Sequence, residues 1–140
     1  MSAEPPVYVL DSFAVLAYLD GEPGMRRVQE VLDDALLGRC QVLLSIINLG
    51  EVLYITEREV GLVQAQAALV AIEQLPLEIL PATRESVLAA AHIKANYRVA
   101  YADAFAVVAA QEFHGRLLTG DPEYKSVESI ASIEWLVEKV

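Results

Sequence analysis

The sequence predicts an α/β fold in which a mainly parallel sheet lies between two layers of helices. Short, continuously apolar runs typical of buried strands alternate along the chain with longer stretches of helical periodicity. The chain has 140 residues, of which 55% are apolar and 21% charged, and this is enough to bury one full core. No linker, repeat or low-complexity stretch interrupts it. We therefore expect a single domain over residues 1–140, built as a three-layer α/β/α sandwich.

Five strands are expected from short apolar runs that end at turn or capping residues. The run Val-Tyr-Val-Leu follows a Pro-Pro pair, stops at Asp11, and is typical of the buried centre of a parallel sheet. Pro76 and Pro81 bracket the third run. The expected strands span residues 7–10, 41–44, 77–80, 116–119 and 133–137.

Six helices are expected among these strands, from apolar side chains that recur every three or four residues. Ser12 opens the first helix, Pro23 fits the first turn of the second, and Ser45 and Thr83 are positioned to cap the third and fifth. Gly61 separates the third helix from the fourth, which predicts an antiparallel helical hairpin. The expected helices span residues 12–19, 23–36, 46–60, 62–75, 84–97 and 102–114.

Acidic residues outnumber basic residues in this chain. It has 20 Asp and Glu against 10 Lys and Arg, which gives a net charge of -10 and a pI near 4.5. This charge excludes functions that rest on a broad cationic surface, such as wrapping duplex DNA or lying on an anionic membrane. The longest strictly apolar runs, 13–19 and 104–110, fall far short of the roughly 20 residues that cross a bilayer, and no secretion signal is visible. We expect a cytoplasmic protein with no membrane partner.

Sulfur and imidazole ligands are scarce. Cys40 is the only cysteine, which excludes an intrachain disulfide and a thiolate zinc cluster. His92 and His114 are too few and too far apart in the sequence to suggest a histidine metal site. The seven glycines fit neither the dinucleotide fingerprint nor the P-loop, and no serine stands in an elbow motif. Any metal chemistry must therefore come from carboxylates.

Four acidic residues stand where a parallel sheet places its ligand sites. Asp11 ends the first expected strand and Asp121 follows the fourth, while Glu51 and Asp103 lie near the starts of helices. Any one of them could simply stabilise a helix N-terminus. Four carboxylates brought together in apolar surroundings, however, need a counter-charge, and Mg²⁺ is commonly held by carboxylates, waters and substrate phosphates. If the four converge, they could support hydrolysis of a phosphodiester.

Four segments follow one another along the chain in a characteristic order: V-Y-V-L-D-S-F-A-V-L (7–16), S-I-I-N-L-G-E-V-L-Y (45–54), Y-A-D-A-F-A-V-V-A-A (101–110) and L-L-T-G-D-P-E-Y (117–124). Together they span nearly the whole chain, and they resemble the PIN-domain family, specifically the VapC-type toxins of toxin–antitoxin pairs. The resemblance implies an α/β/α sandwich and an endoribonuclease that depends on Mg²⁺, for which Mn²⁺ can substitute.

The resemblance also assigns roles to individual residues. The acidic metal and catalytic residues would be Asp11, Glu51, Asp103 and Asp121. Thr119 matches the small hydroxyl residue near the last acid, and Asn48 a polar position one turn before Glu51, with Ser12 as a further supporting residue. Glu123 stands where some members carry another acid, so its participation at a second metal stays open.

Candidate contacts to substrate phosphates come from four basic residues. Lys94 and Arg98 are expected one turn apart on the helix before Asp103, and Arg26 and Arg27 lie on the second helix. The alternative for all four is an ordinary solvated surface.

The expected partners are RNA, a cognate antitoxin and a second copy of the chain. Residues 45–75 offer apolar surface, with Leu49, Leu53, Leu62, Val63 and Leu69, for a homodimer and for an amphipathic helix of the antitoxin. The same stripe could instead belong to the core. A catalytically silent interaction module is the alternative function, and DNA flaps or other nucleic acids are alternative substrates.

Overall fold

The computed structural model describes residues 4–136 and contains one sheet of five strands, all of them parallel. The sheet runs in the order β3-β2-β1-β4-β5. Its strands are β1 (Val7–Leu10), β2 (Gln41–Ser45), β3 (Glu78–Leu80), β4 (Arg116–Thr119) and β5 (Ser132–Trp135). The predicted α/β fold is confirmed, and the sheet is entirely rather than mainly parallel.

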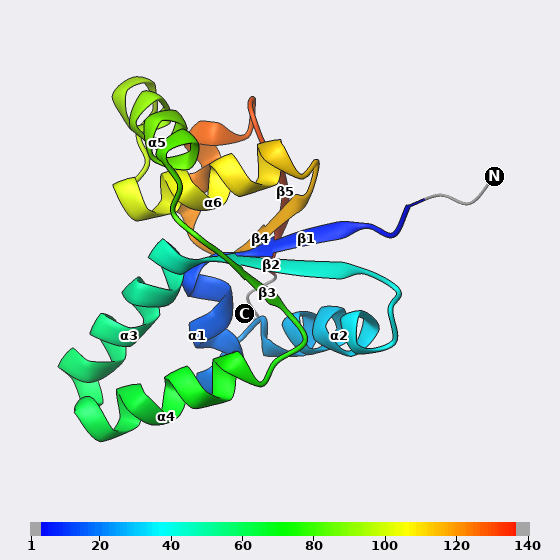
Figure 1. Cartoon of the computed structure of the whole chain (residues 1–140), viewed down its shortest axis with the longest axis vertical. Helices are drawn as coiled ribbons and strands as arrows, with labels where there is room; N and C mark the ends of the chain where they lie inside the picture. Colours follow the sequence, from blue (N-terminus) through cyan, green and yellow to red (C-terminus); the bar gives the residue numbers. More distant parts are fainter. Residues whose placement is uncertain (1–3, 137–140) are drawn as a thin grey trace.

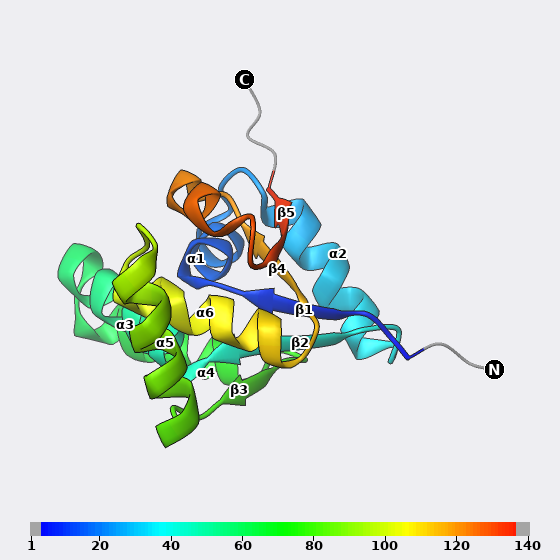
Figure 2. The ribbon, with the colours of Figure 1, turned by 90° about the horizontal axis from the view of Figure 1, so that it is seen from above.

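Helices cover both faces of this sheet, as a three-layer sandwich requires (Figures 1 and 2). One face carries α1 (Ser12–Asp20), α2 (Met25–Leu36), α3 (Ile46–Val60) and α4 (Leu62–Glu73). The other face carries α5 (Arg84–Asn96), α6 (Tyr101–Glu112) and the short 3₁₀ helix η1 (Pro122–Val127). None of the helices within residues 4–136 is long and apolar enough to cross a bilayer.

The core is divided by the sheet into two apolar clusters. On the α6 side, Phe105 and Val107 pack with Val9, Leu117 and Tyr124. On the α1–α4 side, a second cluster includes the following side chains: Leu10, Val15, Val28, Leu44, Val52, Ile72 and Leu118. Alternate residues of β1 and β4 therefore serve opposite clusters, which explains why both strands are continuously apolar.

Several element boundaries differ from the sequence expectations. The second helix begins at Met25 and not at Pro23, because Gly24 adopts a left-handed conformation with φ 99° at the N-cap. The fifth helix ends at Asn96, so the expectation that Arg98 lies on it was wrong. No helix was expected at residues 122–127, where η1 forms. The last strand begins at Ser132 and ends at Trp135, and Val137 of the expected strand lies outside the described residues.

The chain reverses its direction of travel across the sheet between β1 and β4. From β1 it proceeds outward through β2 to β3, and it then returns to place β4 on the other side of β1. Such a switch point leaves a crevice beyond the carboxyl ends of the two central strands, where ligand sites of parallel sheets form. Asp11 and Gly120, the residues that directly follow β1 and β4, lie at this edge.

Candidate metal centre

Asp11 is held at the carboxyl end of β1 by the start of α1. It is the N-cap of this helix, and its Oδ1 accepts a 2.8 Å hydrogen bond from the backbone N–H of Ala14. The side chain is only 1% exposed. The capping role that was considered for any one acid is therefore real for Asp11, and it fixes the carboxylate at the switch point.

Thr119 connects Asp11 to the end of β4. Its hydroxyl donates a 2.6 Å hydrogen bond to Asp11 Oδ2 and accepts a 3.1 Å bond from the backbone N–H of Asp121. Thr119 is fully buried. Both oxygens of Asp11 thus have protein donors, and the turn that carries Asp121 is tied to the same hydroxyl.

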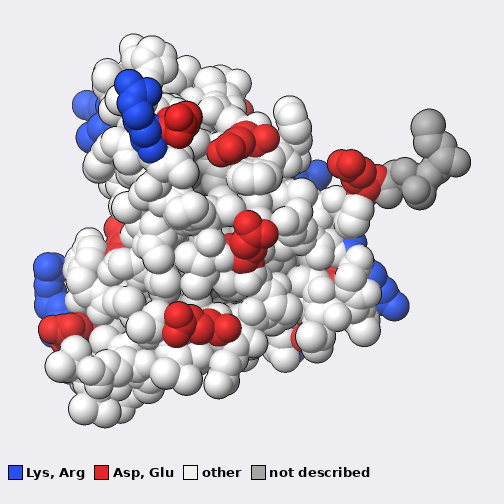
Figure 3. Space-filling model, in the orientation of Figure 1, with Lys and Arg blue, Asp and Glu red and all other residues white. Residues whose placement is uncertain are grey.

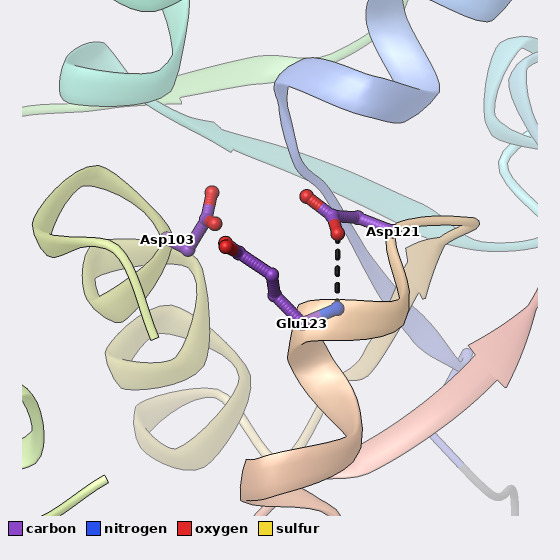
Figure 4. Close-up of side chains that lie close together, drawn as sticks. All are labelled: Asp103, Asp121 and Glu123. Atoms are coloured by element: carbon purple, nitrogen blue, oxygen red, sulfur yellow. Dashed lines mark hydrogen bonds between the residues drawn. The ribbon is translucent and has the colours of Figure 1, made fainter. Parts of the chain in front are cut away.

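Three carboxylates converge in front of this edge (Figure 4). Asp103 lies in the first turn of α6 and is 5% exposed, whereas Asp121 is half-buried and Glu123 is exposed. One oxygen from each of the three lies within 4.8 Å of the others. Asp121 caps η1 by accepting a 2.9 Å hydrogen bond from the N–H of Glu123, which brings Glu123 around to face Asp103. Glu123, left open by the sequence, belongs to this cluster by position.

Glu51 and Ser12 are hydrogen-bonded to each other near Asp103. The Ser12 hydroxyl donates a 2.5 Å hydrogen bond to Glu51 Oε1, and it thereby connects α1 to α3. Glu51 is half-buried and is close enough to Asp103 for its charge to act on that carboxyl. Of the four acids expected from the sequence, the structure therefore gathers Asp103 and Asp121 into one carboxylate cluster, with Asp11 and Glu51 as neighbours of Asp103.

Asp11 and Asp103 are both difficult to ionise. Burial raises the pKa of Asp11 to about 7, against the opposing effect of the hydrogen bonds from Thr119 and Ala14. Burial also raises the pKa of Asp103 to about 7, and the charges of Glu51, Asp121 and Glu123 add to this effect. Two carboxyls at the edge of one sheet are thus poised near neutrality, as is common at functional sites. A bound cation would shift both towards the ionised form.

Two buried polar atoms at the site have no hydrogen-bond partner among the described residues. They are the hydroxyl of Tyr124 and Oδ1 of Asn48. Asn48 uses its Nδ2 to donate a 3.2 Å bond to the carbonyl of Ala102, which joins α3 to the start of α6. Both residues therefore bring a buried polar atom close to the start of α6 or to its acidic neighbours.

The four basic candidates differ in their surroundings. Arg27 makes hydrogen bonds of 2.6 and 3.1 Å with Glu134 on β5 and also lies over the ring of Tyr8, so its guanidinium is already occupied. Arg26 lines a hollow of about 670 Å³ between the α1–α2 loop and the end of β5. Lys94 is exposed in the last turn of α5.

Arg98 lies in the connection that leads to α6. It is exposed, and its carbonyl accepts a 2.7 Å hydrogen bond from Ser126 of η1. The connection with Arg98 is therefore attached to the helix that holds Glu123. On the face drawn in Figure 3, basic groups lie at the margins and acidic groups are scattered between them. This face has no broad cationic patch, in agreement with the exclusion made from net charge.

Comparison with known families decides where this fold belongs. The family model described as PIN domain matches residues 8–130. The chain belongs to the PIN-domain family. This confirms the resemblance read from the four sequence segments, and PIN domains are a nuclease family. No curated protein is similar enough in sequence to count as a match.

Several solved PIN-domain structures share the fold. A chain from DNA-bound VapBC of Salmonella typhimurium has a TM-score of 0.71 at 16% identity, with 94% of this chain and 99% of that chain covered. A chain of VapBC2 from Rickettsia felis, bound to a promoter fragment, has a TM-score of 0.69 at 18% identity, with 91% of this chain and 97% of that chain covered. Mycobacterium tuberculosis VapC20, described as a toxin that cleaves the sarcin–ricin loop, has a TM-score of 0.66 at 16% identity, with 86% of this chain and 94% of that chain covered. The resemblance to the VapC-type toxins is therefore confirmed at the level of fold.

The donors of this PIN domain fit a hard divalent cation. Asp103, Asp121 and Glu123 offer only carboxylate oxygens, which are the ligands that Mg²⁺ and Mn²⁺ take in proteins. Within residues 4–136 no other group of three acidic, histidine or cysteine side chains comes together in this way.

Tyr124 is the residue of this site that sequence reasoning missed. It closes the fourth motif segment, but an aromatic residue three positions after an acid reads as a core residue, and most of its ring is indeed core. Only its burial beside Asp11 and Asp103 distinguishes it. The sequence contains no pattern that predicts the position of Tyr124 beside these two acids.

Proposed function

We propose that this PIN domain is a metal-dependent endoribonuclease and acts as the toxin of a toxin–antitoxin pair. The observation that supports the proposal best is the convergence of Asp103, Asp121 and Glu123 within 4.8 Å, beside the buried Asp11. The family is one of nucleases, and a solved relative of the same fold cleaves the sarcin–ricin loop. A phosphodiester in RNA is therefore the substrate we assign.

The carboxylates divide into two groups by their surroundings. Asp103, Asp121 and Glu123 would hold Mg²⁺ or Mn²⁺, and the ion would supply charge neutralisation of the phosphate and a lowered pKa for a bound water. Asp11 lies outside this cluster and accepts one hydrogen bond on each oxygen, from Ala14 and Thr119, so we propose that it is held in place to add negative charge beside Asp103 and keeps a lone pair on each oxygen for a second ion.

Glu51 is the residue we assign as general base. One of its oxygens accepts the bond from Ser12, which leaves the other free to take a proton from the attacking water. Water attack on the phosphorus breaks the bond to the 3′ oxygen, and the products are a 5′-phosphate and a 3′-hydroxyl. Ser12 then orients the base, and Asn48 holds α3 against α6 through its bond to Ala102.

Phosphates flanking the cleaved bond need local cations. Arg98 is the strongest of the four candidates, because its backbone is bonded to η1, which also supplies Glu123. Lys94 is exposed on the preceding helix and could reach a more distant phosphate. Arg26 and Arg27 lie at the start of α2, and Arg27 is already paired with Glu134, so we assign them at most a minor part.

The activity test uses purified protein with a mixed cellular RNA, Mg²⁺, and a parallel reaction containing EDTA. We expect cleavage by the wild type with Mg²⁺ and none with EDTA, Asp11→Asn or Asp103→Asn. Asp33→Asn is the matched control, because Asp33 is an exposed acid on α2, away from the cluster. Equal cleavage in all reactions would contradict the proposal. Parallel reactions with a single-stranded DNA and a flapped DNA test whether the enzyme prefers RNA over DNA.

The proposed partner surface is the exposed face of α4. Of the residues expected on this surface, Leu62 and Val63 lie on it, whereas Leu49 is buried and Leu53 and Leu69 pack against the core. From Leu62 to Ile72 the helix α4 has no charged residue, yet Leu62 is 55%, Val63 75% and Val70 55% exposed. An uncharged, apolar helix face is unusual on a chain with net charge -10, and it suits a partner's amphipathic helix or a second copy. Solved structures of this fold include toxin–antitoxin complexes, one of them from Klebsiella pneumoniae.

Two size measurements test these partners. Gel filtration of the chain alone is expected to show a homodimer, and co-expression with the neighbouring antitoxin gene is expected to give a complex. Val63→Glu should weaken the interaction, while Glu57→Gln on the exposed part of α3 is the control. If Val63→Glu leaves both the dimer and the complex intact, α4 is not the interface. Binding of the antitoxin without any RNA cleavage by the free chain would favour the silent interaction module.

A further inference from the structure

Tyr124 occupies an unusual position for a phenol. It is 0% exposed and packs among the apolar residues between α6 and η1. Its backbone N–H donates a 3.2 Å hydrogen bond to the carbonyl of Asp121. Tyr124 and Asp121 therefore belong to one turn, and this turn fixes the positions of both residues relative to each other.

The hydroxyl of Tyr124 has no hydrogen-bond partner of acceptable geometry in the described structure. It nevertheless lies next to the carboxyls of Asp11 and Asp103, and burial together with these two charges raises the pKa of Tyr124 far above its ordinary range. The phenol therefore keeps its proton and can act only as a neutral donor or acceptor. A phenylalanine in this place would fill the same core without burying a polar atom.

Asp103 is the acceptor that this donor fits. Both oxygens of Asp11 already receive short bonds, from Ala14 at 2.8 Å and from Thr119 at 2.6 Å. Among the described residues, no hydrogen bond of good geometry reaches the side chain of Asp103. Nearness of the Tyr124 hydroxyl lowers the pKa of Asp11 as well as that of Asp103, so the choice of Asp103 rests on the bonds that Asp11 already receives.

We propose that Tyr124 is a positioning residue of the metal centre, whose buried hydroxyl donates to one oxygen of Asp103 and leaves the other for the cation. This inference rests on the proposed metal site. Ligating carboxylates are commonly oriented by such a donor, and loss of the donor lowers metal affinity. In the structure the hydroxyl has no partner of good geometry, and a small rotation of the Asp103 carboxylate on binding the cation would provide one.

The test compares Tyr124→Phe with the wild type and with Tyr101→Phe. Tyr101 lies on the same helix as Asp103, is 45% exposed and packs its ring edge against Phe105, so it controls for loss of a phenol hydroxyl near the site. Binding of Mn²⁺ and Mg²⁺ is measured by calorimetry, and the melting temperature is measured without metal. We expect Tyr124→Phe to bind either ion roughly 10–100-fold more weakly. Its metal-free melting temperature should be equal or higher, because an unpartnered buried hydroxyl has been removed.

The two measurements separate a positioning role from a structural one. A lower metal-free melting temperature, or failure of Tyr124→Phe to fold, would assign the hydroxyl to stability and overturn the inference. Unchanged metal affinity in a well-folded Tyr124→Phe would also overturn it. If the wild type itself binds neither ion, the proposed metal site fails, and that result is distinct because it appears without any substitution.

Discussion

The hydroxyl of Thr119 bonds at the same time to the carboxylate of Asp11, 108 residues earlier, and to the backbone of Asp121, two residues later. One buried hydroxyl thus sets the spacing between the first and the last acid of the site. The geometry of the candidate metal centre depends on this connection.

Thr119→Val removes the hydroxyl and keeps the shape of the side chain. Asp11 then loses a donor inside the core, and the N–H of Asp121 loses its acceptor. We expect a loss of about 1–3 kcal/mol in the free energy of unfolding, measured in urea, because a buried charged group is left less satisfied. Thr119→Ser retains the hydroxyl and should lose less. Equal losses for the two variants would show that the methyl group, and not the hydrogen bond, stabilises this position.

Metal-free protein should be more stable at mildly acidic pH than at alkaline pH. The pKa of Asp11 and that of Asp103 are both about 7 in the folded chain, whereas a fully hydrated aspartate has a pKa near 3.8, so folding favours the protonated forms. For a raised carboxyl pKa, stability is highest below the unfolded pKa and is lost as pH rises through the folded pKa. We expect these two carboxyls to lower the melting temperature progressively between about pH 4 and about pH 7, with no further loss from them above about pH 8.

Saturating Mg²⁺ should reduce this pH dependence, since the ion compensates the charges that burial opposes. Binding of the ion should also release protons, which is measurable by comparing calorimetric heats in buffers of different ionisation enthalpy. A metal-free melting temperature that rises steadily up to pH 8 would show that these two carboxyls are ionised in the folded state without a cation.

Asp103→Asn should change two properties in opposite directions. It removes a buried charge that Glu51, Asp121 and Glu123 repel, so the metal-free protein at pH 8 should melt at a higher temperature. It also removes a carboxylate of the cluster, so the rise in melting temperature on adding Mg²⁺ should disappear. Thermal unfolding with and without Mg²⁺ measures both effects. Growth arrest on expression should likewise be abolished.

Arg98→Gln and Arg27→Gln should separate substrate binding from stability. Arg98 is exposed and makes no salt bridge among residues 4–136, whereas Arg27 is paired with Glu134 at 2.6 Å. We expect Arg98→Gln to weaken RNA binding in a filter assay without changing the melting temperature. Arg27→Gln should lower stability by up to about 1 kcal/mol and leave RNA binding unchanged. The reverse pattern would place the substrate over the start of α2.

Gly120 lies between Thr119 and Asp121, and the space for a side chain is already filled. A Cβ at this position would collide with the ring of Phe13 on α1. Gly120→Ala should therefore destabilise the protein and weaken metal binding, because Asp121 must shift with the backbone. Gly50→Ala in α3 is the matched control, since a Cβ there meets nothing within 4 Å and should stabilise the helix by up to about 1 kcal/mol. Equal melting temperatures for the two variants would contradict this prediction.

Sequence patterns predicted the parts of the fold that depend on neighbouring residues. Apolar runs located all five strands, and Ser45 and Thr83 are the helix caps that the sequence indicated. Asp11 and Asp121 were placed correctly beyond their strands because parallel strands end at one edge of a sheet. Local sequence patterns did not predict element boundaries that depend on backbone conformation. Examples are the start of α2, which follows Gly24, and the 3₁₀ helix η1.

The side-chain neighbourhoods of the site lay beyond sequence reasoning. The bond from Ser12 to Glu51 joins residues 39 positions apart, and it depends on how α1 packs against α3. Glu123 faces Asp103 only because η1 turns back over α6, and the same turn buries Tyr124. These relationships come from the docking of whole elements, for which periodicity and spacing contain no information.

The separation of Asp11 from Thr119 along the chain also bears on the cell that makes this protein. During translation the first acid emerges early, but its partner hydroxyl, Asp121 and Glu123 emerge more than a hundred residues later. A nascent chain therefore has no complete cluster until η1 has left the ribosome. The nuclease activity that we propose would therefore require the chain to be synthesised through η1 first.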